Sequence, residues 1–223
     1  MRTQKSTALV FPLDMSDASR SNGSHEFRLE GAPTQVVDAT QVDRPRAVAA
    51  AAELLEALGA DLEKSSLAQT PERMVDAYIE QLTPQPFRAT TFPNDGGYDE
   101  LVVAREIEFH SLCEHHLLPF VGVAHVAYLP GERIVGLSKL ARVVEYYARA
   151  LQVQERLTIQ IADWLERELE PRGVGVVLEA EHMCMTLRGV QKPGTKTVTS
   201  ALHGLVRDDP RTRQEFLTLT RGA

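Results

Sequence analysis

The feature that most constrains this chain is a cluster of soft metal-binding side chains at residues 113–116, which read Cys-Glu-His-His. Cys113 and His116 are three residues apart, so a single turn would place both on one side of the backbone. The chain has one other cysteine, Cys184, which follows a histidine by two residues. A catalytic zinc binds thiolate and imidazole through three protein ligands and keeps one position open for water. Cys113, His116 and Cys184 would form such a set if Cys184 arrives from a distant strand.

Two other interpretations of these residues remain open from their spacing. Free cysteine often behaves as a small buried hydrophobe, so residues 183–185, Met-Cys-Met, could be strand core. A closed structural zinc site would need a fourth ligand, for which His110, His115 and His182 are candidates. The pairing of a C-x-x-H motif with an H-x-C motif favours a metal site over plain core.

Composition narrows the class of protein. The 223 residues suit one domain, or one domain with an extension. The net charge of −7 argues against general nucleic-acid binding, which needs a basic surface. No apolar run approaches the roughly 20 residues of a membrane span, and the apolar block 8–11 is too short for a signal peptide. We therefore expect a cytoplasmic protein with reduced thiols and no disulfide, and with neither a nucleic-acid nor a membrane partner.

The amino-terminal part divides into an arm and a helical region. Residues 1–42 lack apolar periodicity and predict a disordered or loosely attached arm. A domain is expected over residues 43–223, and its first part, 43–92, predicts two helices. The first shows apolar residues at three- and four-residue steps and stops at Gly59, and Thr70 is the expected N-cap of the second.

Residues 100–223 predict a core of the α+β class. Two strands precede a pair of amphipathic helices, which begin near Leu137 and Gln154, and further strands follow. The expected strands are 102–109, 120–128, 174–182, 184–190 and 195–202. Asp208 or Asp209 can cap a final helix. This order predicts an antiparallel sheet with the helix pair on one face.

Five separated motifs resemble the GTP cyclohydrolase I family. They are 113–120 (CEHHLLPF), 136–142 (GLSKLAR), 154–158 (QERLT), 182–185 (HMCM) and 188–190 (RGV). The resemblance extends from about residue 44 to the carboxyl terminus. It implies a tunnelling fold, in which subunits join their sheets into a ring. It also implies a homodecamer of two face-to-face pentamers, with active sites at the subunit interfaces.

The resemblance implies an activity and a cofactor as well. Members of the family convert GTP and water into 7,8-dihydroneopterin triphosphate and formate, the first step towards tetrahydrofolate or tetrahydrobiopterin. Carried over by motif, Cys113, His116 and Cys184 are the ligands of Zn²⁺. His115 and His182 are the proton-transfer residues.

The resemblance also implies which residues bind the substrate. Gln154 and Glu155 would hold the guanine, whose two neighbouring N–H donors match the fork of a carboxylate. Ser138, which we count with the catalytic residues, would lie along the ribose and triphosphate with three cations. These cations are Lys139, Arg142 and Arg188. They would form a local basic patch in an acidic chain.

Arg73 is a weaker candidate for a phosphate contact. Three residues after it this chain has Asp76, where many relatives carry a lysine.

Three rival functions differ in what they require. A zinc-stabilised ring protein that binds nucleotide without turnover would need four protein ligands on the metal. A tunnelling-fold enzyme acting on a related pterin or deazapurine would not need the guanine-binding carboxylate together with the triphosphate cations. A nucleobase deaminase would show the motifs H-x-E and P-C-x-x-C, and neither occurs here.

Overall fold

The computed structural model describes residues 25–28 and 37–220. Its strands are β1 (His25–Arg28), β2 (Arg88–Pro93), β3 (Val102–Cys113), β4 (Pro119–Leu129), β5 (Arg133–Val135), β6 (Leu151–Gln152), β7 (Gly173–His182) and β8 (Lys196–His203). Its α-helices are α1 (Arg44–Ala57), α2 (Thr70–Leu82), α3 (Leu137–Ala148), α4 (Gln154–Leu169), α5 (Met183–Thr186), α6 (Gly204–Asp208) and α7 (Pro210–Thr220). The predicted arm 1–42 falls mostly outside the described residues, although β1, within it, pairs with β2.

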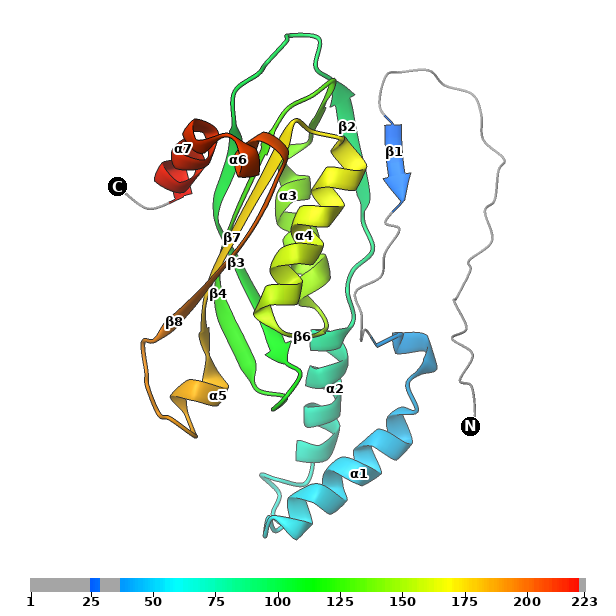
Figure 1. Cartoon of the computed structure of the whole chain (residues 1–223). Coiled ribbons are helices and arrows are strands. Elements are labelled where there is room, and N and C mark those ends of the chain that lie inside the picture. Colours follow the sequence, from blue (N-terminus) through cyan, green and yellow to red (C-terminus); the bar gives the residue numbers. More distant parts are fainter. Residues whose placement is uncertain (1–24, 29–36, 221–223) are drawn as a thin grey trace, which may run out of the picture.

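The core is a five-stranded sheet in the order β6-β3-β4-β7-β8, with α3 and α4 packed on one face (Figure 1). Neighbouring strands are antiparallel, except for the short parallel pairing of β6 with β3. A smaller sheet in the order β1-β2-β5 lies beside it. The α+β class and the antiparallel sheet with a helix pair on one face are therefore confirmed.

Helices α3 and α4 form where they were expected, because the apolar residues of each lie on one side of the helix. In α3 the residues at three- and four-residue steps are almost completely buried, among them Leu140, Val143 and Val144 at 0% exposure. In α4 the corresponding stripe includes Leu157 and Trp164, at 0% and 1%. These stripes pack onto one face of the sheet, α3 mainly over β3 and α4 over β7 and β8, and fix the position of both helices.

The strand expected at 184–190 is wrong. β7 ends at His182, opposite Phe120 of β4, and β4 itself begins one residue earlier. Among the residues that the structure describes, no strand continues there to pair with residues 183–186, which form the short helix α5. Leu187 donates its backbone N–H to the carbonyl of Met183 at 3.0 Å, which closes this turn. Cys184 therefore lies on a helix instead of a strand.

The ends of the helices follow the expected signals in part. Asp209 caps α7, because its carboxylate accepts from the backbone N–H of Thr212 at 2.9 Å. Gly59 follows the end of α1 and takes a positive φ of 91°. Thr70 is the first residue of α2 and not its N-cap, a position that Gln69 occupies without a side-chain hydrogen bond.

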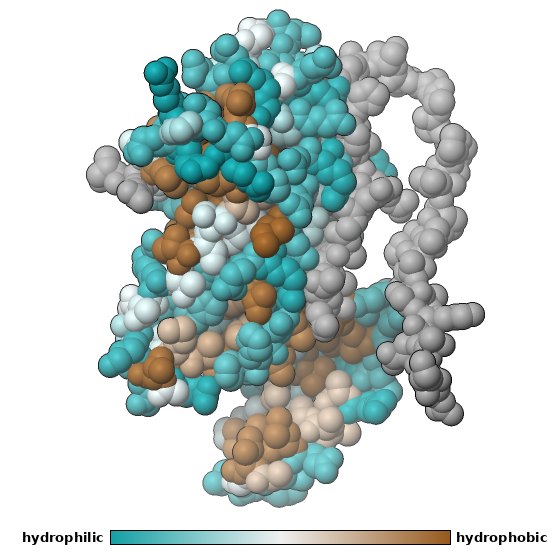
Figure 2. Space-filling view, viewed as in Figure 1, coloured by the Kyte–Doolittle hydropathy of each residue, from teal (hydrophilic) through white to brown (hydrophobic). Residues whose placement is uncertain are grey.

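Helices α1 and α2 form a hairpin that extends beyond the end of the sheet (Figure 1). Leu54, on α1, is 48% exposed, and Leu58, which directly follows α1, is 76% exposed. Figure 2 shows apolar surface on this hairpin, at the lower end of the molecule. Within the described part of the chain, no helix is long and apolar enough to cross a bilayer.

Gly122 is required where β4 passes β7. A Cβ at this position would lie 2.0 Å from the carbonyl oxygen of Glu179 and 2.6 Å from the Cα of Ala180. We expect Gly122→Ala to lower the free energy of unfolding by about 1–3 kcal/mol, because the backbone of β7 must move. Urea unfolding measures this change.

Gly96→Ala is the matched control. A Cβ at Gly96 meets nothing within 4 Å, and the expected change is within about 0.5 kcal/mol. Equal stability of the two variants would contradict the close approach of β4 and β7.

Candidate metal centre and active site

The turn between β3 and β4 presents the Cys-Glu-His-His motif. Cys113, the last residue of β3, donates its backbone N–H to the carbonyl of Leu118 at 2.9 Å, and its own carbonyl accepts from Leu117 at 2.8 Å. Leu117 has a φ of 54°, which lets the chain reverse within this short turn. The Cys113 side chain is buried, whereas His115 and His116 are exposed. The turn therefore separates a buried sulfur from two accessible imidazoles.

Three of the predicted ligands lie together. The ligand atoms of Cys113, His116 and Cys184 are all within 4.8 Å of one another, and the Cys113 Sγ is 3.7 Å from the His116 Nδ1. Helix α5 brings Cys184 to the turn because β7, which precedes it, pairs with β4. Two sulfurs and one imidazole form a donor set that suits zinc. The residues present therefore fit a bound metal ion.

The surroundings of Cys184 disfavour its thiolate form. Burial, and then the neighbouring sulfur of Cys113, raise the pKa of the Cys184 thiol, whereas the charge of Arg188 acts in the opposite direction. Two thiolates side by side are unfavourable without a positive charge between them. A divalent cation would supply that charge.

A fourth protein ligand is not part of this group. The Nδ1 of His115 is 3.7 Å from the Cys113 Sγ, but His115 does not belong to the set whose ligand atoms are mutually close. His182 is hydrogen-bonded elsewhere. Among the described residues the arrangement thus has three ligands, the number typical of a catalytic zinc site.

His182 is held rigidly beside the cluster. Its ring stacks on Phe120, with the ring centroids 4.6 Å apart and the planes within 5°. Its Nε2 lies 2.8 Å from the Oε1 of Gln154. Burial lowers the pKa of His182, and the nearby carboxylate of Glu155 opposes this effect. Burial therefore favours the neutral imidazole.

Gln154 fixes the tautomer of that imidazole. Its Nε2 lies at 2.9 Å from the Thr197 carbonyl, 3.2 Å from the Leu178 carbonyl and 3.1 Å from the Thr199 hydroxyl. The amide nitrogen is therefore committed as a donor, and the Oε1 accepts from His182. His182 then carries its hydrogen on Nε2 and leaves the Nδ1 lone pair available.

The two residues predicted to hold guanine have different surroundings. Gln154 is 1% exposed and its amide is bonded within the core. Glu155, the next residue of α4, is exposed and lies near enough to His182 to affect its pKa. Only Glu155 presents its polar group to solvent. The spacing of the motif could not distinguish the two residues, because they are adjacent in the sequence.

The predicted phosphate-side residues do not all come together in one chain. Arg188 follows α5 on the side of the metal cluster, and it is exposed. Ser138, Lys139 and Arg142 lie in the first half of α3, which starts after β5. The other end of α3 leads to β6, and β6 pairs with Cys113. The start of α3 therefore lies about 18 Å along the helix from the metal end.

Arg73 and Asp76 lie on α2, where Asp76 already has a partner. Its two carboxylate oxygens accept from Arg44 at 2.8 Å each. Arg73 donates to the side chain of Gln69 at 2.8 Å. Neither contact involves Cys113, His116 or Cys184. A phosphate contact from Arg73 stays an untested prediction.

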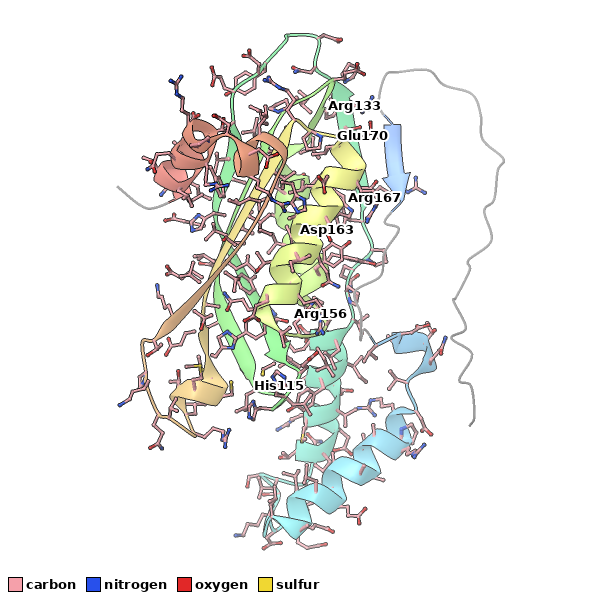
Figure 3. All side chains as sticks on the ribbon, in the orientation of Figure 1. His115, Arg133, Arg156, Asp163, Arg167 and Glu170 are labelled. Carbon is pink, nitrogen blue, oxygen red and sulfur yellow. The ribbon has the colours of Figure 1, made fainter. Side chains whose placement is uncertain are left out.

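A second group of potential ligands lies on α4 and at the end of β8. His203 contacts Glu166 through Nδ1 at 2.8 Å and Asp163, labelled in Figure 3, through Nε2 at 3.3 Å. Both ring nitrogens are thus engaged by carboxylates. A histidine held between two acidic side chains has these contacts without a metal ion, so the group by itself does not indicate a second metal site.

Comparison of the sequence with known families and curated proteins gives GTP cyclohydrolase I. The family model described as GTP cyclohydrolase I matches residues 47–221. The GTP cyclohydrolase 1 of Synechococcus sp. (strain JA-3-3Ab) is 54% identical over 183 residues, which cover 79% of each chain. That of Aquifex aeolicus is 51% identical and covers 81% of this chain and 98% of its own. That of Rattus norvegicus is 48% identical and covers 81% and 77%.

Removal of one sulfur tests the metal centre. We expect Cys184→Ala, purified without chelator, to hold far less than one metal ion per chain, because it deletes one of three ligands. Metal content measured by mass spectrometry checks this. Met185→Leu, in the same short helix, should keep the metal. A full metal complement in Cys184→Ala would exclude Cys184 as a ligand.

Proposed function

Since this chain belongs to the GTP cyclohydrolase I family, we propose that it converts GTP and water into 7,8-dihydroneopterin triphosphate and formate. The observation that carries this proposal is the group of Cys113, His116 and Cys184, with two further histidines beside it. The metal that we propose for this group is zinc. When bound, zinc supplies Lewis-acid activation of water at neutral pH.

His182 is suited to move a proton at Nδ1. Gln154 occupies its Nε2, and burial lowers its pKa, so a neutral imidazole with a free Nδ1 lone pair is favoured. The ring is fixed against Phe120, which holds Nδ1 in one direction. His115, on the exposed side of the turn, is the second proton-transfer residue. Water addition at C8 and opening of the ring both need such transfers.

Glu155 is the proposed guanine-binding residue. Its carboxylate is exposed at the start of α4 and lies close to His182, so a purine held there would be next to the proton-transfer residue. A carboxylate accepts the two parallel N–H donors of guanine, which adenine does not offer. We propose that Gln154 acts on the substrate through His182, because its amide is already bonded within the core.

The separation of Ser138, Lys139 and Arg142 from the metal end supports an active site shared between subunits. We propose that α3 of a second subunit brings these residues to the Cys113 cluster of the first. Exposed apolar side chains flank both halves: Leu137 at 70%, and Leu187 and Val190 at 66% and 60%. Large apolar side chains exposed in this way favour coverage by another copy.

The sheet itself supports assembly into a ring. Among the described residues, the outer edge of β8 has no strand partner, and β3 pairs on its outer side only through Leu112 and Cys113. Two open edges on one sheet allow end-to-end pairing between copies. We propose a tunnelling-fold ring and a decamer of two pentamers, located in the cytoplasm, where Cys113 and Cys184 stay reduced.

The test of the proposed function is GTP turnover with formate and the oxidised, fluorescent pterin both quantified, with and without a chelator. We expect equal amounts of the two products, lost on chelation and restored by zinc. Formate without pterin would indicate a related hydrolase that opens the ring without reclosing it. Absence of both products from the metal-loaded oligomer would support the ring protein that binds nucleotide without turnover.

The shared site gives a complementation test. His115→Ala and Arg142→Ala should each be nearly inactive, since they remove opposite halves of the site. Rings assembled from an equal mixture should recover about a quarter of the wild-type rate, because one interface in four joins two intact halves.

The control mixture combines His115→Ala with His182→Ala. Both substitutions lie in the same half, so no interface is repaired and the rate should stay at background. Failure of the first mixture to exceed this control, with mixed rings demonstrated by mass spectrometry, would contradict the sharing of sites.

A further inference from the structure

Two charged residues of the motifs have no role in the site described so far. Glu114 lies between the ligand Cys113 and His115, and Arg156 follows the proposed guanine-binding residue on α4. The Nη2 of Arg156 donates to the Oε2 of Glu114 at 2.5 Å. Figure 3 shows Arg156 at the first turns of α4 and His115 at the end of the sheet below it. The contact joins segments that are 42 residues apart in the chain.

Arg156 is anchored before it reaches Glu114. Its Nε donates to the Oε1 of Gln152 at 2.9 Å, and its Nη2 also donates to the carbonyl of Leu151 at 2.8 Å. Gln152 is itself 0% exposed and donates to the carbonyl of Tyr147 at 2.9 Å. The guanidinium therefore has a fixed orientation set by buried groups, which an isolated surface ion pair lacks.

Glu114 is tied to the same support by its backbone. Its N–H donates to the carbonyl of Gln152 at 3.0 Å, next to the pairing of Cys113 with Gln152 in the β3–β6 ladder. Both the main chain and the side chain of Glu114 are thus held from the β6–α4 segment. The side chain is 30% exposed, as is that of Arg156, so water screens the pair only partly.

The free oxygen of Glu114 faces His115. Its Oε1 lies 4.0 Å from the His115 Nε2, while the Nδ1 of the same ring lies 3.7 Å from the Cys113 Sγ. The imidazole thus lies between the Glu114 carboxylate and the Cys113 sulfur of the proposed metal site. Such contacts are commonly long before substrate binds and shorten in the complex.

We propose that Glu114 and Arg156 are a positioning pair, in which Arg156 holds the Glu114 carboxylate so that it orients His115 toward the reacting atoms. This inference rests on the proposed function, because it gives His115 its proton-transfer role. The pair does not touch substrate. A carboxylate on the far nitrogen of an imidazole fixes the ring's direction and its tautomer. The stretch 113–116 thus supplies two ligands, a proton-transfer residue and the group that orients it.

Glu114→Gln tests the pair without changing the size of the side chain. We expect kcat for GTP to fall by about 10- to 100-fold, with KM within about twofold of wild type, because binding groups stay in place. The metal content should remain that of wild type. Arg156→Lys keeps the charge but loses the planar fork that contacts Gln152, Leu151 and Glu114, so it should lower kcat in the same way.

The decisive measurement is a double-mutant cycle with His115. In a His115→Ala background, adding Glu114→Gln should change kcat by less than about twofold, because the residue through which Glu114 acts is gone. Additive losses in this cycle would overturn the proposal. Loss of metal from Glu114→Gln in proportion to its loss of activity would also overturn it, since Glu114 would then act on the ligands.

Asp76→Asn is the matched control, because it also turns an arginine-bound carboxylate into an amide, on α2. It should leave kcat and KM near wild type. Wild-type protein measured beside the variants separates the two proposals. Absence of turnover in the wild type rejects the proposed function, whereas normal turnover together with an active Glu114→Gln rejects only the positioning pair.

Discussion

The arrangement of the candidate site depends on the register in which β4 pairs with its two neighbours. Phe120 is opposite Ser111 of β3 and opposite His182 of β7. This register brings the turn after Cys113 and the end of β7 to the same end of the sheet, so that α5 can place Cys184 at the cluster. A slip of one residue would turn His182 to the other face. Gly122 is part of the same constraint, because only a residue without Cβ fits there against β7.

Helix α4 belongs both to the hydrophobic core and to the candidate active site. Its apolar stripe packs against the sheet, and its first residue, Gln154, is buried with that stripe and bonded to β7, β8 and His182. The next residue, Glu155, points to solvent, and Arg156 reaches back to Glu114. Three consecutive residues therefore belong to a buried hydrogen-bond network, the proposed substrate site and the turn of the candidate metal centre. Packing of the helix aligns all three, since one rigid body carries them.

Local structure was the part of the fold that the sequence predicted most reliably. Helices α3 and α4 followed from the periodicity of their apolar residues, and the cap of α7 from Asp209. Prediction from the sequence failed for residues 184–190, because β-branched or apolar residues alone do not supply the neighbouring strand that a β-strand needs. It also treated Gln154 and Glu155 alike, since burial depends on how α4 packs and not on the motif.

The sequence by itself determined the α+β class, the donor types of the candidate metal centre and the family, because these depend on periodicity, side-chain chemistry and motif spacing. The tertiary structure decided which histidine is held by Gln154, how Arg156 supports Glu114, and that the start of α3 lies away from Cys113 within one chain. The physical reason is the range of each interaction. Cys113 and His116 are brought close by one turn of backbone, whereas Cys184 and Arg156 reach that turn only when strands far apart in the sequence pair and a helix packs across them.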